Sequence, residues 1–95
     1  MKIVHVRKDN YDVYVGRGSK WGNPFRIGPD GDRAMVLTKY YRWILTRPDL
    51  LRALPELRGR TLGCFCAPRG GLAPLDPLVC HGQILARLAL GELPC

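Results

Sequence analysis

The sequence lacks a long uncharged apolar segment. No window reaches the roughly 18 to 20 consecutive apolar residues that a membrane-spanning helix requires. Residues 1–8 hold only a short apolar stretch interrupted by His5, whereas a secretory signal needs about 7 to 15 apolar residues and a small-residue cleavage site. We therefore expect a cytoplasmic protein with no membrane partner. In that reducing compartment, clustered cysteines bind metal or react more often than they form disulfides.

Acidic residues are scarce. The chain has 8 aspartate and glutamate residues against 15 lysine and arginine residues, which gives a formal net charge of +7. Cations attract phosphate at long range, so this balance favours a nucleotide or a nucleic acid as partner. No pair of carboxylates is placed for acid–base catalysis, because Asp30, Asp32 and Asp49 suit helix starts. Asp76 is isolated in a loop and is kept only as a candidate extra metal ligand.

The chain also has no internal repeat and no low-complexity tract. Its 95 residues are 46% hydrophobic and 24% charged, which is the ordinary composition of a globular fold and argues against intrinsic disorder. This length predicts a single domain over residues 1–95. Residues 91–95 are expected to form a frayed tail, which makes Cys95 a bystander.

Three runs rich in β-branched and aromatic residues predict strands. They cover residues 2–8, 13–15 and 61–66. The first two are separated by the turn-forming residues 9–12, which favours a hairpin between them. The third run is expected to lie in the centre of the sheet.

Three helices are expected around this sheet. Val36, Tyr40 and Ile44 recur every four residues, which predicts the buried face of a helix. The expected helices run from Asp30 or Asp32 to about Thr46, from 49 to 54 with Pro48 in the first turn, and from 81 to 90 before Gly91. The predicted fold class is α/β (α+β), a single small domain in which two to three helices cover a sheet of about three strands.

Three of the four cysteines and one of the two histidines fall into one candidate cluster. Cys64 and Cys66 are two residues apart in a predicted strand, so their side chains leave the same face, while Phe65 points to the other. Cys80 and His81 follow at the start of the last predicted helix. Three sulfurs and one nitrogen form a tetrahedral zinc set, so zinc is the expected ion. The expected ligands are Cys64, Cys66, Cys80 and His81.

Two other interpretations of the cluster stay open. The spacing differs from the common zinc knuckle, and the cysteines are equally typical of small buried residues on a core strand. Alternatively, one thiol is reactive: Cys80 lies at a helix start, where the helix dipole favours the thiolate, and His81 is a neighbouring base. Cys80, Cys66 and His81 are thus the candidate catalytic residues.

Residues 16–31 form a long segment with five glycines, two prolines and no periodicity. Loops of this length in a compact domain usually carry function, although this one matches neither the Walker loop nor the dinucleotide fingerprint. Its glycines free backbone N–H groups to meet an anion, and Trp21 offers a ring on which a base can stack. Alternatively, Trp21 and Phe25 anchor a turn-rich corner in the core. The candidate ligand-binding residues are Arg17, Gly18, Ser19, Lys20, Trp21 and Asn23.

Four motifs together resemble one known family. They are RGSKWGNPF at 17–25, LPELRG at 54–59, GCFCAP at 63–68 and CHG at 80–82. The pattern is similar to the small bacterial and phage family catalogued as domain of unknown function 4326, over about residues 13–90. The resemblance implies that the three clustered cysteines and His81 act as a unit. The family's frequent occurrence in phage genomes implies a role with nucleic acid or nucleotides.

The chain departs from the family pattern at two places. Residues 69–79, between the last two motifs, are more numerous than in typical members. Gln83 stands where members often carry an acid directly after Cys-His-Gly. If that acid were a catalytic base or a metal ligand, this chain would lack it.

The leading functional hypothesis joins the cluster to the loop. A Cys/His cluster with zinc would lie beside a basic Gly-rich loop that binds a nucleotide, a nucleic acid or another phosphate-bearing ligand. The first alternative is an enzyme that modifies nucleotides or nucleic acid, with Cys80 or Cys66 as nucleophile and His81 as base. The second is a non-catalytic interaction module whose cysteines are structural.

Overall fold

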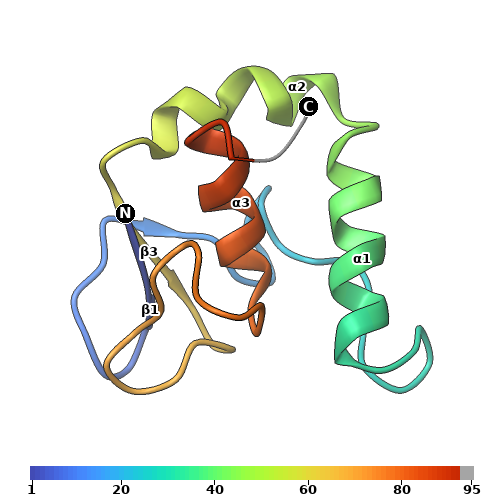
Figure 1. Ribbon diagram of the computed structural model, residues 1–95, viewed down its shortest axis with the longest axis horizontal. Coiled ribbons are helices and arrows are strands. Elements are labelled where there is room, and N and C mark those ends of the chain that lie inside the picture. Colours follow the sequence, from blue (N-terminus) through green and yellow to red (C-terminus); the bar gives the residue numbers. More distant parts are fainter. Residues whose placement is uncertain (93–95) are drawn as a thin grey trace.

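The computed structural model describes residues 1–92, in which three strands form one sheet accompanied by three α-helices (Figure 1). The strands are β1 (Lys2–His5), β2 (Val13–Tyr14) and β3 (Thr61–Cys64). The helices are α1 (Arg33–Ile44), α2 (Pro48–Ala53) and α3 (His81–Ala89), and a short 3-10 helix, η1 (Leu54–Leu57), follows α2. The predicted fold class is confirmed. Cys95 and most of the expected tail lie outside the described residues.

β3 lies in the middle of the sheet, as expected, with β1 and β2 parallel to it on either side. The hairpin predicted between β1 and β2 is wrong, because these two strands do not pair with each other. The reason lies at Asp12, directly before β2. Its backbone N–H donates to the Thr61 carbonyl at 2.8 Å, and its carboxylate accepts the Thr61 N–H at 2.8 Å. These two bonds attach the chain to the edge of β3 opposite β1.

All three strands are shorter than predicted, and β2 ends at Tyr14 rather than at residue 15. β1 ends at His5, whose carbonyl accepts the N–H groups of Lys8 and Asp9 in a turn. β3 ends at Cys64, so Cys66 is not a strand residue. The alternation expected beyond Cys64 therefore fails, and Phe65 is 54% exposed instead of packing under the opposite face of the sheet.

The connection between β1 and β2 crosses one face of the sheet through Tyr11. Gly63 leaves the space for this ring, because a Cβ atom there would lie 2.6 Å from the Cγ of Tyr11. Ile3 and Leu62, which pair in neighbouring strands, are fully buried, and Ile3 meets α3 at Gly82. The two faces of β3 are thus covered differently, one by a helix and one by a loop.

α1 begins after Asp32, whose carboxylate accepts the Met35 N–H at 2.9 Å. The predicted helical spacing is confirmed on its inner face. The buried residues of α1 are Val36, Leu37, Tyr40 and Ile44. The Tyr40 hydroxyl donates to the Trp21 carbonyl at 2.6 Å, which ties the segment 16–31 to this helix.

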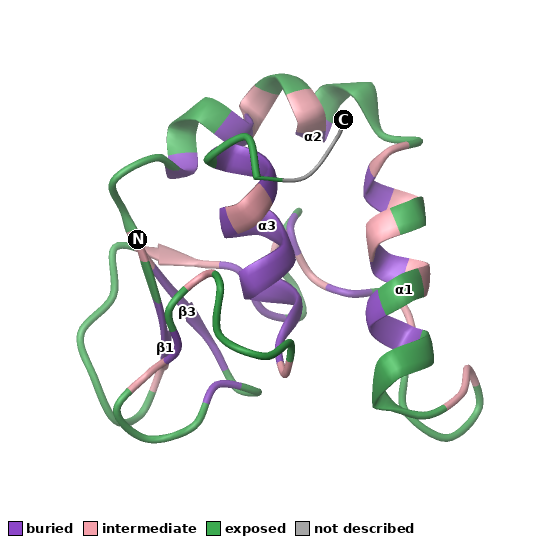
Figure 2. Cartoon of the chain, in the orientation of Figure 1, coloured by how far each residue is buried: buried purple, intermediate pink, exposed green. Residues whose placement is uncertain are grey.

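α3 is the central helix and lies between the sheet and α1 (Figures 1 and 2). Every residue of α3 except Arg87 is buried, so it is a core helix rather than an amphipathic surface helix. Gly91, with a φ of +78°, follows its end as expected. α2 begins at Pro48, one residue before the expected start, and Pro48 lies in its first turn as expected, where a missing N–H leaves no helical bond unmade. No described helix is long and apolar enough to cross a membrane.

Candidate metal centre and adjoining cleft

The cysteine cluster lies at the carboxyl edge of the sheet. β3 ends at Cys64 and β2 ends at Tyr14, and the chain that leaves each strand turns over this edge. In open parallel sheets, ligands bind outside the carboxyl ends of the strands, where the connecting loops gather. The start of α3, with Cys80 and His81, meets the same edge.

The sulfur atoms of Cys64, Cys66 and Cys80 lie within 4.8 Å of one another. The Sγ of Cys64 is 3.3 Å from that of Cys66 and 2.7 Å from that of Cys80. Cys66 and Cys80 are close enough to form a disulfide, and their Cα atoms are 5.6 Å apart. The fold therefore brings together the three cysteines that the sequence grouped. As thiolates they can hold a metal, and on oxidation Cys66 and Cys80 can bond to each other.

His81 reaches this cluster from the first residue of α3. Its Nδ1 is 3.8 Å from the Sγ of Cys66, and its Nε2–H donates to the Val15 carbonyl at 2.6 Å. Because a carbonyl only accepts, Nε2 carries the proton, and in a neutral ring the lone pair is on Nδ1. Burial lowers the pKa of His81, against the opposing effect of the Val15 hydrogen bond, and the nearby Arg17 cation lowers it further. A neutral imidazole thus turns its lone pair towards the cluster.

Cys80 and His81 are adjacent, yet both side chains reach the cluster because the backbone changes conformation between them. Cys80 is extended, with φ −136° and ψ 141°, and caps α3, whereas His81 is already helical. The change directs Cys80 towards Cys64 and His81 towards Cys66.

Backbone N–H groups surround the sulfurs. The Gly82 N–H donates to the Sγ of Cys80 at 3.4 Å. Burial raises the pKa of the Cys64 thiol, and hydrogen bonds from the backbone of Cys66 and Ala67 act in the opposite direction. N–H donors of this kind stabilise thiolate sulfur, the form that binds a metal.

The three clustered cysteines could hold a metal ion. Three thiolates and one imidazole form a known tetrahedral set, and metal-bound imidazoles usually donate their other N–H to a carbonyl or a carboxylate, as His81 does to Val15. With Zn–S bonds of about 2.3 Å, neighbouring ligand atoms lie about 3.5 to 3.8 Å apart. The distance between His81 and Cys66 has this value. To complete a four-ligand site the sulfur atoms would move apart, and His81, which lies outside the group of ligand atoms within 4.8 Å of one another, would move closer to the other two sulfurs. Asp76 is no ligand, because its carboxylate lies outside the cluster and accepts the Ala73 N–H.

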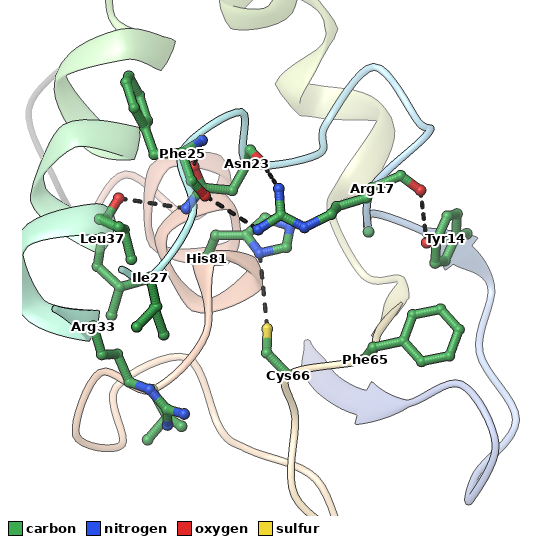
Figure 3. Close-up of a pocket in the computed structure, with 13 residues that line it drawn as sticks. Tyr14, Arg17, Asn23, Phe25, Ile27, Arg33, Leu37, Phe65, Cys66 and His81 are labelled. Carbon is green, nitrogen blue, oxygen red and sulfur yellow. Dashed lines mark hydrogen bonds between the residues drawn. The ribbon is translucent and has the colours of Figure 1, made fainter. Parts of the chain in front are cut away.

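A cleft of about 270 Å³ opens beside the cluster, with Cys66 and His81 in its wall (Figure 3). The lining also includes three aromatic side chains, Tyr14, Phe25 and Phe65, and two cationic side chains, Arg17 and Arg33. No described residue in the lining is acidic. Apolar walls with a few charged groups are typical of small-molecule sites, and here the charge is positive.

Arg17 lies against His81 in the wall of the cleft (Figure 3). Its guanidinium donates to the carbonyl oxygens of Asn23 at 2.7 Å and Phe25 at 3.1 Å, so the loop itself fixes its position. A guanidinium has five N–H donors, so further donors remain for a ligand.

Asn23 also lines the cleft, but its side chain holds the loop. Its Oδ1 accepts the Phe25 N–H at 2.9 Å, and its Nδ2 donates to the Val36 carbonyl at 3.4 Å. Trp21 is only 2% exposed, so its ring anchors the loop in the core and has no open face for a base.

Three further candidates from the loop lie outside the cleft lining. Ser19 donates to the Gly16 carbonyl at 2.7 Å, and Lys20 pairs with Glu56 at 3.3 Å. Gly18 adopts a φ of +91°, which suits glycine in a turn. The fold thus separates the loop cations, bringing Arg17 to the cluster and Lys20 to η1.

Arg33 and Phe65 are among the cleft residues that sequence reasoning missed. Arg33 is the first residue of α1, and no hydrogen bond or ion pair of its side chain is found among the described residues. No local pattern marks an arginine at a helix start as a site residue. A strand that continued to residue 66 would point Phe65 to the opposite face of the sheet, so the strand pattern does not predict its place beside the cluster. The Gly-Cys-Phe-Cys motif itself was the signal that it borders the cluster.

The family of the chain follows from comparison with known proteins. The family model described as Domain of unknown function (DUF4326) matches residues 2–91. The chain belongs to this family. It is 36% identical over 93 residues to "Uncharacterized protein R718" of Acanthamoeba polyphaga mimivirus, across 83% of this chain and 67% of that protein. It is 32% identical over 92 residues to an uncharacterized 12.4 kDa protein in the nrdA-td intergenic region of Enterobacteria phage T4, across 92% of this chain and 75% of that protein.

Both of these DUF4326 relatives are viral proteins, which agrees with the phage association that the motifs implied. No solved structure matches the chain.

The structure connects Gln83 with the segment 69–79, the two places where the sequence was expected to depart from the family pattern. Gln83 is fully buried, and its Oε1 accepts the N–H groups of Val79 at 2.7 Å and Cys80 at 3.0 Å. Its Nε2 lies within hydrogen-bond distance of the Asp76 and Pro77 carbonyls, at 3.0 and 3.2 Å. An acid could accept the first pair of bonds but could not donate the second. A glutamine at this position therefore suits the long segment 69–79 that it fastens to α3.

Proposed function

We propose that this chain is a zinc protein that binds a phosphate-bearing ligand, a nucleotide or a nucleic acid, beside its metal. Cys64, Cys66, Cys80 and His81 would hold the zinc, and the cleft next to them would take the ligand. The observation that carries the proposal is the orientation of the His81 ring, whose Nε2–H donates to the Val15 carbonyl while its Nδ1 faces the Sγ of Cys66. Bound zinc would join the end of β3 to the start of α3.

The proposal for the metal is supported by the chemistry of the donors. The cluster offers soft sulfur ligands; Cys64, Cys80 and His81 are buried while Cys66 is exposed, and backbone N–H groups lie at two of the sulfurs. Thiolate ligands require reduced cysteines, so the proposal places the protein in a reducing compartment, the cytoplasm. Oxidation of Cys66 and Cys80 to a disulfide would remove two ligands.

The proposal for the ligand is supported by charge. Arg17 and Arg33 line the cleft, and no acidic side chain among the described residues lines it with them. Arginine is the side chain that best matches phosphate, because its planar guanidinium presents paired donors. The Arg33 side chain has no partner in the described part of the chain that would compete with such a ligand.

The metal is tested by measuring zinc in protein purified with a reductant and without chelators. We expect about one zinc per chain, because a Cys/His set of four ligands binds one ion. Cys64→Ser, Cys66→Ser and Cys80→Ser should each lose it, and His81→Ala should bind it at least about tenfold more weakly. The chain supplies matched controls: Cys95→Ser and His5→Ala should keep the metal.

A folded and fully reduced protein that takes up no added zinc would contradict the metal centre. A second candidate function would then apply, because Cys66 is exposed, lines the cleft and lies 3.8 Å from the Nδ1 of a histidine that Val15 orients. That is the geometry of an activated nucleophile with its base. Iodoacetamide would then modify Cys66 faster than Cys95, and His81→Ala would remove the difference.

The phosphate subsite is tested with ribose 5-phosphate, which carries a phosphate and no base. Binding followed by calorimetry should weaken about tenfold or more in Arg17→Ala and in Arg33→Ala, since charge-assisted bonds to phosphate are strong. Lys20→Ala is the matched control, because Lys20 is paired with Glu56 outside the cleft. Equal losses in all three variants would show that only net charge matters and would contradict a built phosphate subsite.

A further inference from the structure

Phe65 is an apolar ring on the rim of a charged cleft. It is 54% exposed although it stands between two cluster cysteines, where the chain leaves β3. Apolar side chains are often exposed singly, and exposure alone carries no conclusion. Phe65 differs because it lines the same cleft as Arg17, Cys66 and His81.

Neighbouring side chains hold this ring in place. The rings of His5 and Tyr14 stand nearly perpendicular to it, with centroids at 5.7 and 6.2 Å. The guanidinium of Arg7 lies over it, 5.7 Å from its centroid. Tyr14 is itself fixed, because its hydroxyl donates to the Arg17 carbonyl at 2.8 Å. The aromatic group and the phosphate-binding arginine are thus parts of one connected structure.

We infer that Phe65 is the stacking surface for the base of a nucleotide whose phosphate meets Arg17 and Arg33. This inference rests on the proposed phosphate subsite and adds the identity of the ligand. A ring beside a phosphate-binding cation is the combination by which proteins hold unpaired nucleotides, because every base has a π-face and every nucleotide a phosphate. Arg7, whose guanidinium lies over the Phe65 ring, adds a third cation near the cleft.

The size of the cleft suits a single nucleotide unit. Its volume, about 270 Å³, is near the lower end of the range for small-molecule sites. The bases of a duplex are paired and stacked inside the helix, so they cannot reach a ring at the rim unless one base is unpaired. The ligand is therefore a free mononucleotide or an unpaired nucleotide in a single strand.

The experiment compares ligands that differ by the base. Calorimetry on the full, reduced chain measures the binding of ribose 5-phosphate, a purine and a pyrimidine mononucleotide, a ten-nucleotide single strand and the matching duplex. Stacking on an aromatic side chain strengthens binding by about tenfold to a hundredfold. We expect both mononucleotides to bind more tightly than ribose 5-phosphate by that factor.

The variants assign this gain to Phe65. Phe65→Ala should remove the difference between nucleotide and sugar phosphate while leaving the binding of ribose 5-phosphate unchanged. Phe65→Trp should keep the gain, and its added fluorescence should be quenched when a base stacks on it. Leu75→Ala, which truncates another exposed apolar side chain outside this cleft, is the matched control and should change neither value.

The outcomes separate this inference from the proposal on which it rests. If ribose 5-phosphate does not bind, the phosphate subsite is wrong. If ribose 5-phosphate binds as tightly as the nucleotides, or Phe65→Ala weakens all ligands equally, the subsite stands and the stacking role of Phe65 is wrong. Duplex that binds as tightly as the single strand also contradicts it. Tighter binding of the strand than of the mononucleotide identifies a nucleic acid as the source, and equal binding identifies a free nucleotide.

Discussion

Two buried polar residues at the start of α3, His81 and Gln83, have different structural roles. His81 connects the cluster to the carbonyl of Val15, sixty-six residues away in sequence. Gln83 uses both ends of its amide to hold the segment before the helix. Burying such groups is costly unless they are hydrogen-bonded, and no buried polar side-chain atom without a partner is found among the described residues. Because the polar atoms of His81 and Gln83 are hydrogen-bonded, a helix in the core can contain both side chains.

Gln83→Glu tests the connection between this residue and the long segment. A carboxylate would still accept the N–H groups of Val79 and Cys80, but it would face the carbonyl oxygens of Asp76 and Pro77 without donating to them. We expect a loss of about 1 to 3 kcal/mol in the free energy of unfolding, measured with urea, and faster proteolysis within residues 69–79.

The control for this variant is Arg69→Ala, an exposed residue in the same segment with no side-chain partner among the described residues. It should leave both values unchanged. A Gln83→Glu protein with the stability of the unmodified chain would show that the donated bonds do not hold the segment.

The strand β3 is the element on which the site depends. It is buried along Leu62, Gly63 and Cys64, it pairs on both edges, and it ends at the cluster. Gly63 is required for a reason that local sequence does not reveal, since the ring of Tyr11 from the β1–β2 connection occupies the place of a side chain. A single glycine thus permits the crossover that puts β2, and with it Arg17, at the same edge as the cysteines.

Gly63→Ala measures this contact. The new methyl group would lie 2.6 Å from the Cγ of Tyr11, too close for two carbon atoms, so the ring or the strand must shift. We expect the variant to lose about 1 to 3 kcal/mol of unfolding free energy, as in other overpacked sites. Urea unfolding of Tyr11→Ala and of the double variant completes the cycle. In the double variant, Gly63→Ala should cost much less; an equal cost in both backgrounds would mean that Tyr11 is not the obstacle.

At the scale of the whole molecule, the charge is largely unpaired. The chain carries a formal charge of +7, and two ion pairs, Lys20 with Glu56 and Arg47 with Asp49, are found in residues 1–92. The carboxylates of Asp12, Asp30, Asp32 and Asp76 hold turns and helix starts instead. Four of the eight acids therefore bond to the backbone, and most of the cations form no ion pair, although several donate to backbone carbonyls instead.

Much of the fold could be predicted because it depends on local chemistry. Asp32 caps α1, Pro48 lies in the first turn of α2, and Gly91 follows α3, each at its expected place. These signals act over one helical turn, so neighbouring residues are enough to locate them. The hairpin failed because strand pairing depends on a distant partner, Thr61, which Asp12 binds across 49 residues.

The cysteine cluster of the candidate site could also be predicted, because it too depends on local chemistry. The grouping of Cys64, Cys66 and Cys80 needed only a strand end and a helix start, and the structure brings these sulfurs together. Arg33 and Phe65 were missed, because their position in the cleft depends on how α1 and the end of β3 are placed relative to the loop. Trp21 and Lys20, which sequence placed beside Arg17, lie in the core and at η1 respectively.

The sequence by itself determined the fold class, the helices and the three cysteines that can hold a metal, because propensity, capping and side-chain chemistry are properties of short segments. The tertiary structure decided which residues share one cleft and which atom of each faces it. Strand order and helix placement follow from burying apolar surface across the whole chain. Residues that are close in sequence can therefore lie far apart in the fold, and residues that are distant in sequence can lie side by side. The Nδ1 of His81 faces the sulfurs only because the carbonyl of Val15 occupies the other nitrogen.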